Sequence, residues 1–279
     1  MDIIEYNRKI TDYGNGKVEI VAYHKPQQRL IGMSHRGGLN EKSEISDQAQ
    51  LERTKKQIYD IKRRIKGYAL ANDFMWFGTL TINPKKGDRF NYDVAKSMLL
   101  KWCRWMRDRY GKFEYLIVPE LHKSGAVHFH SLLGDIPAQF NEAKNPKTDK
   151  LLIRNGRQIY NLKDWKNGFS DCEKIVDPDR TASYITKYIT KDLMNSKEMF
   201  AKKRYFNSQG LKKPKVKLEL TDNSDLKNFT PNFGVVDIDE YGKNYVDKGI
   251  YRLSHDKQGD FYQDDKNYIF KSKNKKVSD

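Results

Sequence analysis

The sequence is poor in cysteine and has no long apolar run. Its 279 residues include two cysteines, Cys103 and Cys172, and they form neither a Cys-x-x-Cys pair nor a ladder with histidines. That spacing excludes a disulfide scaffold and a cysteine-rich zinc module, and we expect two reduced, buried thiols. No segment approaches the about 18 consecutive apolar residues of a membrane helix, and the first residues lack a signal-peptide run. We therefore expect a soluble, cytoplasmic protein without a membrane partner.

A phosphate-binding P-loop is also missing, which argues against a fused ATPase. Positive charge, in contrast, is abundant. There are 53 lysines and arginines against 37 acidic residues, so the formal net charge is +16. Such an excess indicates a polyanionic partner, although ribosomal, membrane-surface and DNA-binding proteins all share it. The apolar content of 37% is low but sufficient for a folded core.

The order of predicted elements indicates a main domain with two appendages. We expect an accessory region over residues 1–50, a main domain over 51–215 and a partly flexible appendage over 216–279. The principal elements are predicted at 18–23 (strand), 47–72 (helix), 75–83 (strand), 92–110 (helix), 113–122 and 126–134 (strands) and 178–194 (helix). The strand–helix–strand–strand order of 75–134 predicts an α+β fold, with a mainly antiparallel central sheet and helices on one face.

The two predicted strands at 113–134 carry a potential metal site. His128 and His130 are two residues apart, so they project from one face of a strand. A three-residue loop ending in a left-handed Gly125 would place Glu120 directly across from His128. This register predicts a Glu–His–His cluster, open on one side and suited to a divalent ion. Two alternatives stay open: a plain hairpin with surface histidines, or a structural zinc, although no fourth ligand is evident and His122 is more typical of a turn.

The second chemical motif is a Tyr-Ile-Thr-Lys sequence that occurs twice in succession. On a helix Tyr184 and Tyr188 are one turn apart, as are Lys187 and Lys191. A phenol with a pKa near ~10 needs a nearby cation or metal to become a nucleophile. Two tyrosines packed at the edge of a surface helix are the alternative. An apolar stripe would dock the helix on the sheet, formed by Ala182, Ile185 and Ile189.

Together these segments resemble the rolling-circle replication initiators of the His-hydrophobe-His (HUH) endonuclease superfamily, in particular the two-tyrosine type of phages and small plasmids. That family has three motifs in order: a strand similar to 77–81, a metal hairpin similar to 120–130, and a Tyr-x-x-Lys-Tyr helix similar to 184–188. Relaxases of the same superfamily usually carry the tyrosine ahead of the metal motif. The resemblance covers roughly residues 74–210, and no helicase domain accompanies it.

The resemblance implies a central sheet of about five strands, similar to an RNA-recognition motif. It also implies an enzyme, a nickase-ligase that cuts one strand at an origin and later rejoins strands. Its product would be a 5′-phosphotyrosine link and a free 3′-hydroxyl. The implied roles are Mn²⁺ or Mg²⁺ held by Glu120, His128 and His130; catalysis by Tyr184, Tyr188 and Lys187; and DNA contacts from Lys191, Thr79 and Thr81.

The implied partners are single-stranded or hairpin origin DNA, a host helicase and a host polymerase, in the cytoplasm of a host cell. Three alternatives remain. A transposase or mobilisation nickase would share the site and differ in what it recognises. A non-enzymatic RNA-binding domain would need exposed aromatic side chains on the middle strands. A metal-dependent hydrolase without a covalent intermediate would leave the paired tyrosines unexplained.

Overall fold

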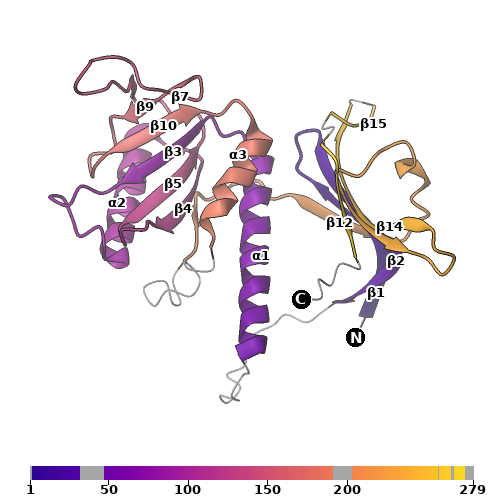
Figure 1. Ribbon diagram of the computed structural model, residues 1–279. Coiled ribbons are helices and arrows are strands. Elements are labelled where there is room, and N and C mark those ends of the chain that lie inside the picture. The colour runs from indigo at the N-terminus through magenta and orange to yellow at the C-terminus, as the bar shows by residue number, and fades with distance from the viewer. Residues whose placement is uncertain (1, 32–46, 191–202, 257, 265–266, 274–279) are drawn as a thin grey trace. The chain divides into compact units, whose positions relative to one another are not determined.

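The computed structural model describes residues 2–31, 47–190, 203–256, 258–264 and 267–273. The chain divides into two compact units (Figure 1). The central unit comprises Glu44–Lys212, and the terminal unit joins Met1–Ser43 to Lys213–Asp279. Each unit is built on its own sheet, and the two are described separately.

The central unit contains a seven-stranded antiparallel sheet, which confirms the α+β class. Its strands lie in the order β11 (Phe206–Asn207), β4 (Tyr115–Leu121), β5 (Val127–Leu133), β3 (Trp76–Thr81), β10 (Ser170–Lys174), β9 (Tyr160–Leu162) and β6 (Phe140–Glu142). The last two strands extend the sheet beyond the five or so expected from the sequence. A separate small hairpin is formed by β7 (Ile153–Arg154) and β8 (Arg157–Gln158).

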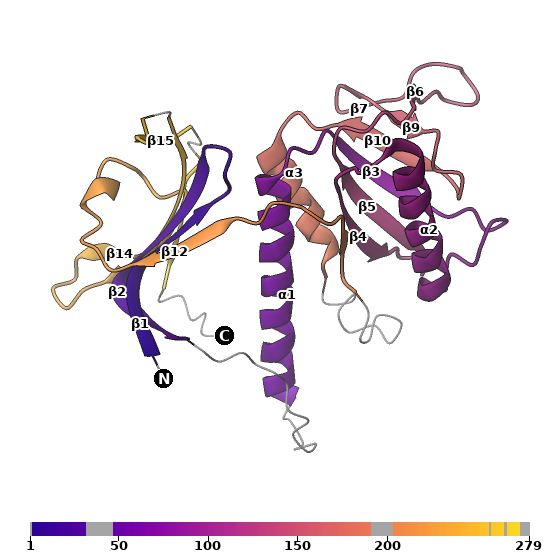
Figure 2. The ribbon, with the colours of Figure 1, turned by 180° about the vertical axis from the view of Figure 1, so that it is seen from behind.

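Helix α2 (Tyr92–Tyr110) covers one face of this sheet and forms much of its core (Figures 1 and 2). The helix begins where the Asn91 side chain accepts hydrogen bonds from the Asp93 and Val94 amides, as expected for an N-cap. Its predicted bounds, 92–110, are confirmed, and one side of the helix carries an apolar stripe. The buried side chains of the stripe include Ala95, Leu99, Trp102, Cys103 and Met106.

The opposite face of the sheet carries α3 (Pro178–Ile185) and the 3-10 turn η1 (Thr186–Tyr188), with α1 (Asp47–Ala71) packed against α3. Figures 1 and 2 show the sheet between α2 and α3. Helices therefore lie on both faces, and the expectation of helices on one face was incomplete. Alternation along β5 explains this, because Phe129 and His130 point to opposite faces and α3 packs over the histidine side.

Helix α3 is shorter than the helix predicted over 178–194. Asp177 is its N-cap and accepts a hydrogen bond from the Arg180 amide at 2.9 Å. Regular helix ends at Ile185, and Ile189 leaves the helical region at φ −84° and ψ 89°. Thr186 and Thr190 add β-branched residues that lower helix propensity, and the Thr186 hydroxyl donates back to the Ser183 carbonyl. Residues 191–194 of the predicted helix lie outside the described residues.

The terminal unit is a second sheet built from both ends of the chain. Its strands run in the order β12 (Lys215–Glu219), β1 (Asp2–Asp12), β2 (Lys17–Ile31), β14 (Asn244–His255), β13 (Phe233–Ile238) and β16 (Ile269–Ser272), with β15 (Phe261–Tyr262) paired to β14. The 3-10 turn η3 (Ser224–Leu226) contributes Leu226 to a core shared with Val18, Ile20 and Leu253.

A buried arginine links the two ends. The Arg8 guanidinium donates hydrogen bonds to Asp225 and to the Asn223 side chain, the latter at 2.8 Å. The two appendages predicted from the sequence therefore share one sheet. No helix in the described part of the chain combines the length and apolar character needed to cross a membrane.

Candidate active site

The β4–β5 hairpin has the predicted register. Glu120 lies directly opposite His128. The loop closes through a hydrogen bond from the His122 amide to the Ala126 carbonyl at 2.9 Å, and Gly125 adopts a left-handed φ of +83°. A side chain at that position would strain the turn, which explains the glycine. Glu120, His128 and His130 thus project from the same face of the sheet, as predicted.

His130 is the most constrained of these three residues. Its Nε2 lies 2.7 Å from Oε2 of Glu120, and its Nδ1 lies 3.1 Å from the Thr79 hydroxyl on β3. The Thr79 contact fixes the ring orientation and leaves Nε2 directed at the carboxylate. The hydrogen bond from His130 is the main cause of a lowered pKa at Glu120. Although His130 points away from the α2 core, its side chain is only 5% exposed.

His128 has a different environment. It is half-buried, and its ring stacks on His122, with centroids 4.9 Å apart and planes at 15°. Burial is the main cause of a lowered pKa at His128, and the charge of His122 adds to the effect. His122 is exposed and close to the Ser124 hydroxyl, at 2.9 Å from Nδ1. Within the described residues, no three His, Cys, Asp or Glu side chains already converge on one point.

The tyrosine segment meets this hairpin directly. The Tyr188 ring lies flat on the His130 imidazole, with centroids 3.4 Å apart and planes at 9°. Tyr184 stands perpendicular to Tyr188 at 5.6 Å and contacts Phe77 of β3 at 5.4 Å. The predicted docking stripe is confirmed, since three apolar side chains of the segment are fully buried: Ala182, Ile185 and Ile189.

The two tyrosines differ in exposure and surroundings. Tyr184 is 43% exposed, and the Lys187 ammonium lies 5.0 Å from its ring centroid. Tyr188 is half-buried, and burial raises the pKa of its phenol well above the usual value, with a hydrogen bond to Tyr184 acting in the same direction. Tyr184 is therefore the more accessible hydroxyl, and Tyr188 the one that covers His130.

The residues predicted to contact DNA are placed as follows. The Thr79 hydroxyl lies 3.1 Å from Nδ1 of His130, and the Thr81 hydroxyl donates to the Phe169 carbonyl at 3.0 Å. Both hydroxyls are thus engaged within the protein. Lys191 lies outside the described residues.

One cation beside the site was not anticipated. Arg154 of β7 forms an ion pair at 2.5 Å with Asp171, which lies opposite Thr79 in the sheet. The hydrogen bond to Asp171 is the main cause of a raised pKa at Arg154. A second ion pair joins the same small hairpin to β10, with Arg157 of β8 3.6 Å from Glu173 of β10.

Residues 75–193 match a family model of replication-associated proteins, described under the name ORF2. Comparison with curated proteins gave no match, and comparison with solved structures gave none either. The matched segment begins just before β3 and includes the hairpin and both tyrosines. It supports a role in the initiation of DNA replication, an endonuclease type of activity and binding to DNA for the central unit of this chain.

Proposed function

We propose that this chain is a rolling-circle replication initiator of the two-tyrosine HUH type, which nicks one DNA strand by tyrosine attack. The observation that carries the proposal is the stacking of Tyr188 on His130, at a centroid distance of 3.4 Å. These residues are far apart in sequence and come from different elements. Their contact brings potential nucleophiles onto the potential metal ligands.

The donor set fits a divalent metal. A carboxylate and two imidazoles on one sheet face are ligands that Mn²⁺ accepts. Mg²⁺ also binds carboxylate oxygens. The Thr79 hydroxyl on Nδ1 of His130 is the outer contact expected of a ligating histidine, since it directs Nε2 toward the site. Glu120, His128 and His130 would hold the ion. When bound, it would polarise a non-bridging oxygen of the scissile phosphate.

The reaction that these residues would perform is an in-line displacement at phosphorus. The tyrosine Oη would form a bond to phosphorus, while the bond from phosphorus to the 3′ oxygen breaks. The phenol proton would leave to solvent, and the departing 3′ oxygen would take up a proton to become a hydroxyl. The 5′-phosphotyrosine link would keep the energy of the phosphodiester, so attack by a 3′-hydroxyl would later rejoin the strand and restore the phenol.

Tyr184 is the better placed of the two for the first attack. It is the more exposed phenol, and the Lys187 ammonium lies 5.0 Å from its ring centroid. This cation would stabilise a phenolate or a phosphate oxygen by direct electrostatic attraction. Tyr188, one turn further on, would serve as the second nucleophile when Tyr184 is already esterified at the end of a replication round.

The charge distribution agrees with DNA as the partner of the central unit. Of the 53 lysines and arginines, 33 fall within Glu44–Lys212, together with 20 of the 37 acidic residues. The central unit therefore has a net charge of +13 out of the total +16. We propose single-stranded or hairpin origin DNA as the substrate, in the cytoplasm of a host cell that supplies a helicase and a polymerase.

A chelation experiment tests the metal part of the proposal. Labelled single-stranded DNA is incubated with the protein, and cleavage is followed on a denaturing gel. EDTA should abolish cleavage, and Mn²⁺ or Mg²⁺ should restore it. His128→Ala should abolish cleavage with little loss of stability, because that side chain is only half-buried. His130→Ala is the poorer test, since it also empties the space beneath Tyr188. Full cleavage in excess chelator would contradict the metal assignment.

A further inference from the structure

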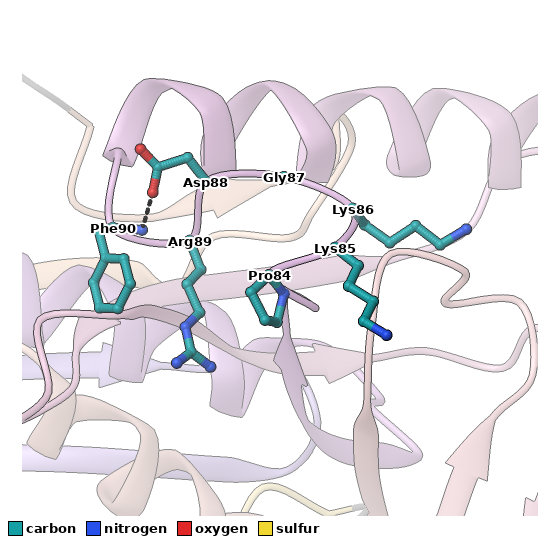
Figure 3. Close-up of a pocket in the computed structure, with 7 residues that line it drawn as sticks. All are labelled: Pro84, Lys85, Lys86, Gly87, Asp88, Arg89 and Phe90. Atoms are coloured by element: carbon teal, nitrogen blue, oxygen red, sulfur yellow. Dashed lines mark hydrogen bonds between the residues drawn. The ribbon is translucent and has the colours of Figure 1, made fainter.

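The loop that joins β3 to α2 forms a basic hollow beside the hairpin. Residues 84–90 line a cavity of about 480 Å³, which is the size of a small-ligand pocket. Its lining contains three cations, Lys85, Lys86 and Arg89, against one acid, Asp88. Figure 3 shows the Lys85 and Arg89 side chains leaving the loop on the same side, with Pro84 between them, while Asp88 points the other way.

Arg89 has unused hydrogen-bonding capacity in this hollow. Its Nε is buried, and among the described residues it has no hydrogen-bond partner. A buried guanidinium nitrogen without an acceptor is costly, unless a ligand supplies one. A phosphate oxygen is a strong acceptor for arginine. The guanidinium carbon also lies 5.1 Å from the Phe90 ring centroid, so a cation and an aromatic ring share the hollow.

The Phe90 side chain is accessible, because 51% of the residue is exposed. The loop around it is held in place. The Phe90 amide donates to the Asp88 side chain at 2.9 Å, as drawn in Figure 3, and the Lys86 amide donates to the Asn83 carbonyl at 2.8 Å. A fixed, exposed ring next to a guanidinium is the arrangement on which unpaired bases stack.

The hollow is fastened to the proposed catalytic hairpin. The Val127 amide, directly before His128, donates to the Arg89 carbonyl at 2.8 Å. On the loop of the same hairpin, a Cβ added at Gly125 would lie 3.6 Å from the Phe90 ring. The hollow and the proposed metal ligands therefore belong to one continuous surface.

We propose that the 84–90 loop is a binding subsite for the single-stranded DNA that flanks the scissile phosphate. Arg89 binds a backbone phosphate, Phe90 stacks on an unpaired base, and Lys85 and Lys86 attract the neighbouring backbone. The subsite rests on the proposed nicking function, because it identifies how the substrate is held next to His128. It also explains a preference for unpaired DNA, since a base within a duplex is already stacked and cannot cover Phe90.

A binding experiment in EDTA separates the two interactions. Fluorescence anisotropy is measured with two labelled probes of about 12 nucleotides: an oligothymidylate and an abasic oligomer with the same phosphates and no bases. Phe90→Ala should weaken binding of the oligothymidylate roughly tenfold and leave the abasic probe unaffected. Arg89→Ala should weaken both probes and lower the salt slope by about 0.7. The hydrogen bond from the Val127 amide to the carbonyl of residue 89 does not involve the side chain, so this substitution leaves it in place.

Arg104→Ala is the matched control, since it removes an exposed arginine from α2, the helix on the other face of the sheet. It should leave binding of both probes close to that of the unchanged protein. Wild-type affinity in both loop variants, or equal losses in the control, would overturn the subsite. Covalent adduct formation is scored in parallel with Mn²⁺. If the unchanged protein forms an adduct and the loop variants bind DNA normally, the nicking function stands and the subsite is rejected. If the loop variants lose binding and the unchanged protein forms no adduct, the subsite stands and the nicking function is rejected.

Discussion

At the scale of single residues, the Thr79 hydroxyl is the group that connects the central strand to the proposed metal site. It lies 3.1 Å from Nδ1 of His130. Thr79→Val keeps the shape and removes this contact, so we expect nicking to fall roughly 10- to 100-fold, as is usual for outer contacts of metal ligands. The free energy of unfolding should fall by only about 1 kcal/mol.

Thr81→Val is the natural comparison for that variant. Thr81 lies on the same strand and face, but its hydroxyl donates to the Phe169 carbonyl. At equal Mn²⁺ concentration, Thr79→Val should therefore nick DNA clearly more slowly than Thr81→Val. If the two variants lose activity equally, Thr79 has no special role in orienting His130.

The two cysteines provide a second test at this scale. Burial raises the pKa of each thiol, Cys103 and Cys172, to about 12. Because only the thiolate reacts, a thiol with that pKa is ionised at roughly one part in 10,000 at pH 8. The folded protein should therefore not react with a thiol reagent at pH 8, and two thiols should appear after denaturation. Rapid reaction in the folded state would show that the two side chains are not buried as described.

At the scale of elements, the start of α3 controls where the tyrosines lie. Asp177 caps the helix and accepts a hydrogen bond from the Arg180 amide. Asp177→Ala should lower the free energy of unfolding by about 1 kcal/mol, measured with denaturant. Adduct formation should fall as well, because the tyrosines lose part of their support. Asp177→Ser should recover most of the stability, since serine is also a good N-cap. An alanine variant with unchanged stability would show that packing alone positions α3.

The hairpin and the helices show how far sequence reasoning reached. The register of Glu120 and His128 follows from strand alternation and one glycine turn, both of which are local. The bounds of α2 follow from its cap and its apolar stripe. The early end of α3 is harder to predict from the sequence. The helical spacing of apolar residues continues through Ile189, while the β-branched residues weaken the helix itself. The Arg154–Asp171 pair depends on how a small hairpin folds back over the sheet, which no local pattern predicts.

At the scale of the whole molecule, the division into two units separates charge as well as structure. The central unit has most of the net charge, +13 of +16. A fragment of residues 44–212 should therefore retain most of the salt dependence of single-stranded DNA binding, which is about 0.7 log units per log of salt for each phosphate neutralised. Binding isotherms at several salt concentrations measure this slope. A fragment with a nearly flat response would assign the DNA contacts to the terminal unit instead.

The terminal unit could not be derived from the sequence for a reason of the same scale. Its sheet pairs β1 with β12 and β2 with β14, across more than half of the chain. Pairings between segments so far apart in the chain leave no local pattern that identifies the two partners. The buried Arg8 is an example of such a distant pairing, because its hydrogen-bond partners Asn223 and Asp225 lie near the other end of the chain.

The central claim is that a tyrosine of η1 or α3 becomes covalently linked to DNA. The most direct measurement is mass spectrometry of the protein after incubation with a pool of single-stranded oligonucleotides and Mn²⁺, followed by nuclease and protease digestion. The account predicts a nucleotide attached through its 5′ phosphate to Tyr184, transferred to Tyr188 in Tyr184→Phe and absent in the double phenylalanine variant. Cleaved DNA without any protein adduct, or an adduct on another residue, would contradict it.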